Sequence, residues 1–117
     1  MMETNNDIVV FCHDDIIFNT KNWGRKLKSL FEKNPEYGII GIAGTTDLID
    51  GRWWTLKESM NGIVSHQHEG KKWTNYYSKD QGKTITEMVA LDGLFFAIDK
   101  TKIKHTFDED FHGFHFY

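Results

Sequence analysis

The sequence has one cysteine, one proline and no long apolar run among its 117 residues. The single cysteine, Cys12, cannot form an internal disulfide, so the cysteine content gives no sign of an oxidising compartment. No apolar run approaches the ~18 residues of a membrane-spanning helix, and residues 1–7 lack the basic and apolar regions of a signal peptide. These absences predict a cytoplasmic protein without a membrane span.

Neither sign of charge dominates the chain. Fourteen Lys and Arg residues oppose 17 Asp and Glu residues, which gives a formal net charge of −3, and the basic residues are scattered. Nucleic-acid binding needs a cluster of basic side chains that neutralises phosphates, so nucleic acid is disfavoured as a partner. Glycine-rich phosphate loops of the GxGxxG or GxxxxGK type are absent as well. The 39% hydrophobic content is enough for the core of one globular domain.

The first part of the chain has the pattern of an α/β fold. Residues 7–12 and 38–43 are short apolar runs rich in β-branched residues, which predicts strands buried on both faces in a parallel or mixed sheet. Between them, Asn19 or Thr20 can cap a helix that ends at the Asn-Pro pair 34–35. The apolar positions of this helix recur at helical spacing: Trp23, Leu27, Leu30 and Phe31. Strand, helix and strand within ~40 residues indicate one right-handed βαβ unit.

The later part of the chain has shorter β patterns. Residues from about 45 to 83 are expected to form a β insertion with a hairpin built from 63–68 and 73–78. Residues 84–91 are typical of a further strand, which runs into Asp92-Gly93 and a second apolar run at 94–98. A short helix is expected from Asp99 to Lys104.

His13, Asp14 and Asp15 follow directly after the first predicted strand. In an open α/β sheet, ligands bind beyond the carboxyl ends of the strands. Two adjacent carboxylates need water, a cation or another partner, and Mg²⁺ or Mn²⁺ completed by phosphate oxygens meets that need. The alternative is that Asp14 and Asp15 are turn residues with Asx-type hydrogen bonds.

Two further acidic sites have both a binding and a structural interpretation. Asp92-Gly93, at the end of another predicted strand, could accept hydrogen bonds from a hydroxylated ligand or form an ordinary Asp-Gly turn. Asp108, Glu109 and Asp110 lie between aromatic residues, although three adjacent acids more often form a solvated loop.

Histidine and cysteine suggest two other classes of site. Four histidines could gather around zinc, but no HExxH or CxxC element supports this; they are His66, His68, His112 and His115. Cys12 beside a histidine could be a nucleophile, but a cysteine inside an apolar strand is usually an inert hydrophobic residue.

The aromatic residues of the β insertion allow a different function. Trp53-Trp54, Trp73 and Tyr76-Tyr77 could stack on sugar or base rings, although single aromatic residues more often belong to a core. An adjacent Trp pair in an extended segment points one ring to each side, so one of the two is expected to be exposed, and Trp54 is our candidate substrate-binding ring. A non-catalytic carbohydrate- or nucleotide-binding module is therefore the alternative function.

Three motifs resemble those of family 2-like glycosyltransferases with the GT-A fold. Residues 11–16, Phe-Cys-His-Asp-Asp-Ile, are similar to the strand that ends in the DxD-type metal motif of that family, with His in place of the first acid. Residues 89–98 are similar to its acceptor-side segment, and residues 107–117 to the stretch leading to its catalytic acid. The motifs occur in the family's order, and the resemblance covers the chain from about Asp7 onward.

The resemblance implies a GT-A-like α/β fold with a mixed sheet and flanking helices. It implies a nucleotide-sugar donor, a saccharide or other hydroxyl acceptor, and Mn²⁺ or Mg²⁺ on the diphosphate. Asp15 would be the metal ligand with His13 assisting, while Asp14, Asp92 and Gly93 would meet the substrates. The catalytic carboxylate would be represented by three acids: Asp108, Glu109 and Asp110.

The resemblance also predicts that residues 1–117 are a single partial domain. The family's amino-terminal βαβαβ portion would precede the His-Asp-Asp strand, and its catalytic base would follow the aromatic stretch, beyond Tyr117. We therefore expect a glycosyltransferase fragment with little or no transfer activity by itself. Strand edges exposed around residues 8–11 and 39–42 would then favour homo-oligomers.

Overall fold

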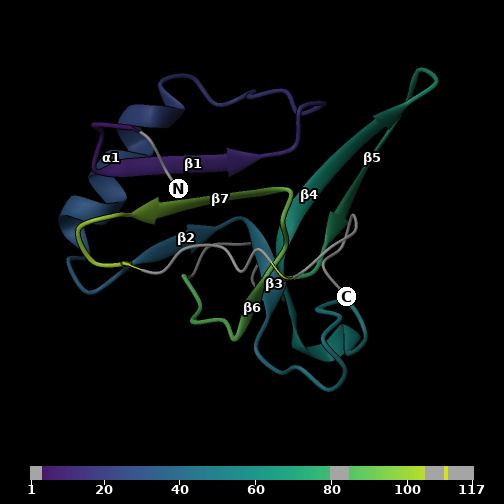
Figure 1. Cartoon of the computed structure of the whole chain (residues 1–117). Coiled ribbons are helices and arrows are strands. Elements are labelled where there is room, and N and C mark those ends of the chain that lie inside the picture. Colours follow the sequence, from purple (N-terminus) through teal and green to yellow (C-terminus); the bar gives the residue numbers. More distant parts are fainter. Residues whose placement is uncertain (1–3, 80–84, 105–109, 111–117) are drawn as a thin grey trace.

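The computed structural model describes residues 4–79, 85–104 and 110, and these form two small sheets and a helix (Figure 1). The first sheet has three strands in the order β1-β7-β2, with bounds β1 Ile8–Cys12, β7 Phe95–Asp99 and β2 Ile39–Gly41. The central strand β7 is antiparallel to both neighbours: Ile8 pairs with Asp99, Cys12 with Phe95, and Ile39 with Ile98. β1 and β2 therefore run parallel to each other with β7 between them.

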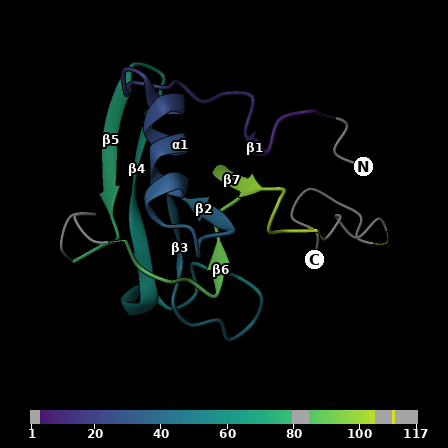
Figure 2. The same ribbon diagram turned by 90° about the vertical axis from the view of Figure 1, so that its left-hand side faces the viewer.

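The helix α1 (Trp23–Lys33) connects β1 to β2 and supplies one side of the core (Figure 2). Asn22 precedes it in a left-handed conformation without a side-chain cap, and at its other end the Asn34 side-chain amide donates to the Leu30 carbonyl at 2.7 Å. The buried cluster comes from α1 and β7, and its members are Leu27, Phe31, Phe95 and Ala97.

The second sheet has four strands in the order β5-β4-β3-β6, all antiparallel to their neighbours. Its strands are β3 (Ala43–Thr45), β4 (Met60–His68), β5 (Lys71–Tyr76) and β6 (Ala90–Leu91), and the short 3-10 helix η1 (Lys57–Ser59) leads into β4. The hairpin of β4 and β5 projects away from the rest of the molecule (Figure 1). Both residues of its turn, Glu69 and Gly70, have positive φ, as the two-residue turns that match strand twist require.

The two sheets meet where the backbone passes from β2 to β3. Ile42 alone separates these strands, so the chain leaves the first sheet and enters the second within one residue. Gly62 of β4 lies against this junction with φ 122°, and a Cβ atom there would be 2.4 Å from the Ile42 carbonyl oxygen. A Cβ on Gly44 would be 2.3 Å from the Ala90 carbonyl oxygen. The second sheet thus depends on backbone approaches that only glycine permits.

The α/β class, the helix and the hairpin are confirmed. Leu27 and Phe31 are buried as the helical spacing predicted, although the helix begins after Asn22 and not after Asn19 or Thr20. The hairpin pairs Ile63 with Tyr76 and His66 with Trp73.

Other strand predictions were wrong. β1 is half-buried and not covered on both faces, and residues 38–43 are split between two sheets because the chain bends at Ile42. Of the strand expected at 84–91, only Ala90–Leu91 forms among the described residues. Asp99 begins a turn and not a helix, because its carboxylate accepts hydrogen bonds from Thr101 two residues later.

β1 and β2 are the outer strands of the first sheet, and pairing of chains through these edges stays a prediction. Within the described residues, the structure has no helix long and apolar enough to cross a membrane.

Candidate functional site

The structure brings together two segments that the sequence analysis singled out separately. The His13 backbone N–H donates to the Leu94 carbonyl at 3.1 Å, directly after the paired residues Cys12 and Phe95. His13 therefore lies beside Leu94, although the two residues are far apart in the sequence. The Asp92 backbone N–H donates to the Ala43 carbonyl at 2.9 Å, which ties the same turn to β3 of the second sheet.

His13, Asp14 and Asp15 are exposed at this junction. The His13 Nδ1 and Asp15 Oδ1 atoms are 4.0 Å apart, and the two side chains are 47% and 83% exposed. Among the described residues, neither Asp14 nor Asp15 makes the Asx-type hydrogen bonds that the structural alternative expected. Both carboxylates thus extend into water without a role in the turn.

The donor set fits a hard divalent cation with most of its coordination open. Within the described part of the chain, no three His, Cys, Asp or Glu side chains are grouped so that they could hold a metal by themselves. Mg²⁺ and Mn²⁺ are commonly held by one or two protein oxygens and completed by phosphate oxygens and water. His13 and Asp15 fit that incomplete site and do not fit a closed protein cage.

One carboxylate oxygen of Asp92 closes a turn by accepting a hydrogen bond, and the other does not take part in the turn. Its Oδ1 accepts from the Leu94 backbone N–H at 3.0 Å, so the Asp-Gly turn interpretation accounts for this atom. Its Oδ2 has no hydrogen-bond partner among the described residues. The half-buried Asp92 and the exposed Gly93 lie next to His13 through Leu94, and Oδ2 remains able to accept from a hydroxyl group.

Trp54 lies in the loop between β3 and η1, where an aspartate organises the chain. Asp50 accepts from the Arg52 guanidinium and from the Thr55 hydroxyl, the latter at 2.9 Å. These bonds, that from Arg52 above all, lower the pKa of Asp50 to about 2. Trp53 and Trp54 lie in a turn and not in an extended segment, and their rings touch edge to face with centroids 6.3 Å apart. Trp53 is half-buried and Trp54 is 41% exposed, so one ring of the pair is exposed as expected.

Two of the three predicted catalytic carboxylates are not among the residues that the structure describes. Asp108 and Glu109 lie outside the described residues, while Asp110 is an exposed residue in a turn. Tyr117, beyond which the resemblance places the catalytic base, also lies outside the described residues. The position of the base, and the low activity expected of the chain by itself, therefore stay predictions.

The zinc and thiol interpretations gain no support. The His66 ring stacks on Trp73, and His112 and His115 lie outside the described residues. Cys12 is the last residue of β1 and is exposed, so it does not pack as a hydrophobic residue inside the strand as expected.

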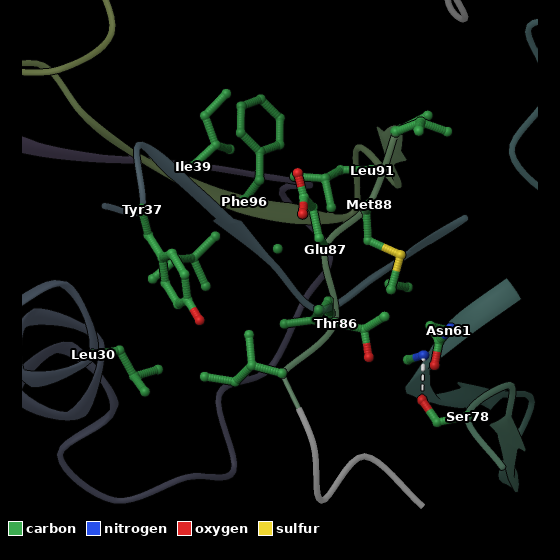
Figure 3. Close-up of a pocket in the computed structure, with 18 of the residues that line it drawn as sticks. Leu30, Tyr37, Ile39, Asn61, Ser78, Thr86, Glu87, Met88, Leu91 and Phe96 are labelled. Atoms are coloured by element: carbon green, nitrogen blue, oxygen red, sulfur yellow. Dashed lines mark hydrogen bonds between the residues drawn. The ribbon is translucent and has the colours of Figure 1, made fainter. Parts of the chain in front are cut away.

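A pocket of about 1120 Å³ lies away from these residues, between α1, β2 and the segment 85–91. Figure 3 shows Leu30 and Tyr37 on one side, Asn61 and Ser78 on the other, and Thr86 and Glu87 between them. Its walls are mostly apolar, and none of the predicted site residues that the structure describes lines it. Sequence reasoning missed this pocket because residues 84–91 were expected to form one regular strand. Among the described residues of that segment, only Ala90–Leu91 forms a strand.

Comparison with known proteins shows what the chain is similar to. No curated protein and no solved structure matched the chain. The family model described as a glycosyltransferase-like family matches residues 1–117, the whole sequence. This agrees with the α/β architecture and supports a glycosyltransferase kind of function. With an exposed His-Asp-Asp segment joined to an Asp-Gly turn in its fold, the chain belongs to the glycosyltransferase-like family.

Proposed function

We propose that the chain forms the part of a glycosyltransferase that holds the diphosphate of a nucleotide-sugar donor through Mn²⁺ or Mg²⁺. The observation that carries this proposal is the hydrogen bond from His13 to Leu94, which joins the exposed His-Asp-Asp segment to the Asp92 turn. Family membership supplies the reaction class, and the exposed donors supply the chemistry.

Each residue has a distinct task in this proposal. Asp15, with His13, would hold the cation, which neutralises the charge that develops on the leaving diphosphate. Asp14, exposed beside them, would meet the donor. Asp92 Oδ2 would accept a hydrogen bond from a sugar hydroxyl, while Oδ1 keeps the turn closed through Leu94. The acceptor hydroxyl would lose its proton to a carboxylate, for which Asp108, Glu109 and Asp110 remain the candidates.

Titration with Mn²⁺, in the presence and absence of UDP or GDP, tests this proposal. We expect the diphosphate to strengthen Mn²⁺ binding, because its oxygens complete the coordination sphere. Asp15→Asn should weaken Mn²⁺ binding at least about tenfold, the loss typical when metal-site residues are changed.

Asp7→Asn is the matched control, because Asp7 is an exposed aspartate just before the opposite end of β1. This variant should bind Mn²⁺ like the unchanged chain. An equal loss in both variants, or Mn²⁺ binding that ignores the diphosphate, would refute the proposal. Mn²⁺ binding that Asp15→Asn leaves unchanged, together with binding of sugar in the absence of metal, would favour the non-catalytic binding module.

A further inference from the structure

One face of the β4–β5 hairpin presents a preorganised aromatic surface. His66 and Trp73 are directly paired across the two strands, and their rings stack with centroids 5.0 Å apart and planes 11° apart. Trp73 is nevertheless 47% exposed. Because β5 is the outer strand of the sheet order, Trp73 has a ring partner on the β4 side and no ring contact beyond the edge within the described residues. The indole is thus both oriented and accessible.

Asn75 sets the hydrogen-bonding roles of the polar atoms beside Trp73. Its side-chain amide nitrogen lies 3.2 Å from His66 Nε2 and donates to the Tyr77 hydroxyl at 3.1 Å. Since an amide nitrogen only donates, Nε2 must accept, and the neutral imidazole then carries its proton on Nδ1. Neither Asn75 Oδ1 nor His66 Nδ1 has a partner among the described residues. One acceptor and one donor are therefore available beside the indole.

We propose that this face, made of Trp73, His66 and Asn75, binds the saccharide acceptor of the transfer reaction. The inference rests on the proposed function and deepens it, because it names a neutral glycan as the acceptor class. A pyranose with equatorial hydroxyls has an apolar face of C–H groups that can lie on an indole, with hydroxyls at its rim. The available acceptor and donor are the partners that such hydroxyls require.

The size of the surface favours a glycan over a protein partner. One indole with two polar groups is far smaller than the ~1,200 Å² of a stable protein interface. Ring stacking fixed by Asn75 lowers the entropy lost when a small ligand binds.

The face made of Trp73, His66 and Asn75 is also connected to the candidate donor site through the backbone. Asp92 is hydrogen-bonded to Ala43, Ala43 is paired with Gly62, and the Tyr77 N–H donates to the Gly62 carbonyl. A continuous series of backbone hydrogen bonds therefore joins the hairpin to the Asp92 turn.

The opposite face of the hairpin offers a matched control. Tyr76 is next to Asn75 in the sequence, points to the other side of the strand and is 64% exposed. Among described residues Tyr76 makes no ring contact, so its ring is not held in one orientation. A nonspecific effect of removing an exposed aromatic ring would appear in Tyr76→Ala as well.

Titration of ¹⁵N-labelled protein with cellohexaose, maltohexaose and chitohexaose, up to about 10 mM each, tests the proposal. We expect at least one of these glycans to give a saturable shift of the Trp73 indole N–H signal without metal. Trp73→Ala should weaken that binding at least about tenfold, and Trp73→Phe, which keeps a ring on His66, should weaken it less. Tyr76→Ala should bind like the unchanged chain.

Three results would overturn the inference: no binding of any of the three glycans, equal losses in Trp73→Ala and Tyr76→Ala, or a Trp73 shift with uridine in place of glycan. Mn²⁺ and UDP titration of the unchanged chain separates this outcome from the proposed function. Mn²⁺ binding that UDP strengthens, in a chain that binds none of the three glycans, would refute the acceptor surface and leave the donor site standing.

Discussion

The first sheet and the second sheet obtain their stability from different parts of the chain. In the first sheet, α1 and β7 bury Leu27, Phe31, Phe95 and Ala97, so side-chain packing holds the strands. The second sheet also buries side chains on β3 and β4, among them Met60 and Val64, and it depends in addition on the close backbone approach that Gly62 allows. Its hairpin keeps Trp73 and Tyr76 exposed. The first sheet is therefore a packed scaffold, whereas the hairpin of the second sheet offers exposed side chains to a ligand.

The largest effect is expected from Phe31→Ala, which removes a ring that is only 4% exposed in the first sheet's core. Loss of buried contacts and the cavity left behind should lower the free energy of unfolding by about 3–5 kcal/mol in urea denaturation. Phe18→Ala is the control, because Phe18 is 41% exposed and stacks on Trp23 at the edge of the cluster. An equal loss in both variants would contradict a packed core under α1.

Gly62→Ala should have the next largest effect, and it tests the close backbone approach in the second sheet. The added Cβ would meet the Ile42 carbonyl oxygen and the Ala43 Cα at 2.4 and 2.6 Å, in a conformation with φ 122°. We expect destabilisation of about 3 kcal/mol in the same urea experiment. Gly24→Ala should instead be neutral or stabilising by up to about 1 kcal/mol, because nothing lies within 4 Å of its Cβ position in α1.

Lowering the pH should destabilise the folded protein more through protonation of Asp99, at the end of β7, than through protonation of Asp50, in the loop before η1. The Thr101 hydroxyl donates a hydrogen bond to the Asp99 carboxylate and lowers its pKa. Burial raises the pKa, but Lys102 lowers it again, so the pKa of Asp99 is lowered overall. A carboxylate with a lowered folded-state pKa stabilises the protein above its unfolded pKa, about 4, and that stability is lost as pH falls through the folded pKa.

Urea unfolding between about pH 2 and pH 6 measures this difference. Asp99→Asn should lose about 1 kcal/mol near neutral pH and show a flatter decline in acid. Asp50→Asn should change the curve less, because solvent screens the exposed Asp50–Arg52 pair even though the pKa of Asp50 is lowered to about 2. A steeper acid decline in Asp99→Asn would contradict the assignment.

Local patterns predicted α1 and the hairpin because their determinants lie within a few residues of each other. The spacing of Leu27 and Phe31 defines a helical face, and the Glu69-Gly70 turn joins two alternating segments. The antiparallel position of β7 between β1 and β2 depends on pairs such as Ile8 with Asp99, which no local pattern contains. The bend at Ile42 likewise depends on Gly62 of a later strand.

The candidate site was predictable in its residues but not in its assembly. His13, Asp15 and Asp92 were found because polar residues follow apolar strands. Their proximity through Leu94 required the register of β1 with β7. The link from Asn75 to His66 was missed, since nothing in the sequence shows which amide meets which imidazole.

The central position of β7 sets an order in which the molecule can be built during synthesis. β1 and β2 are made early, yet among the described strands each pairs only with β7, whose last residue is Asp99. The hairpin of β4 and β5 needs no distant partner for its own ladder, and isolated hairpins form in about 1–10 μs. During synthesis all residues of the β4–β5 ladder are therefore made before β7, whereas the first sheet stays incomplete until residue 99. The hairpin alone is marginally stable at best, so it can pair early but persists only once the rest of the sheet has formed.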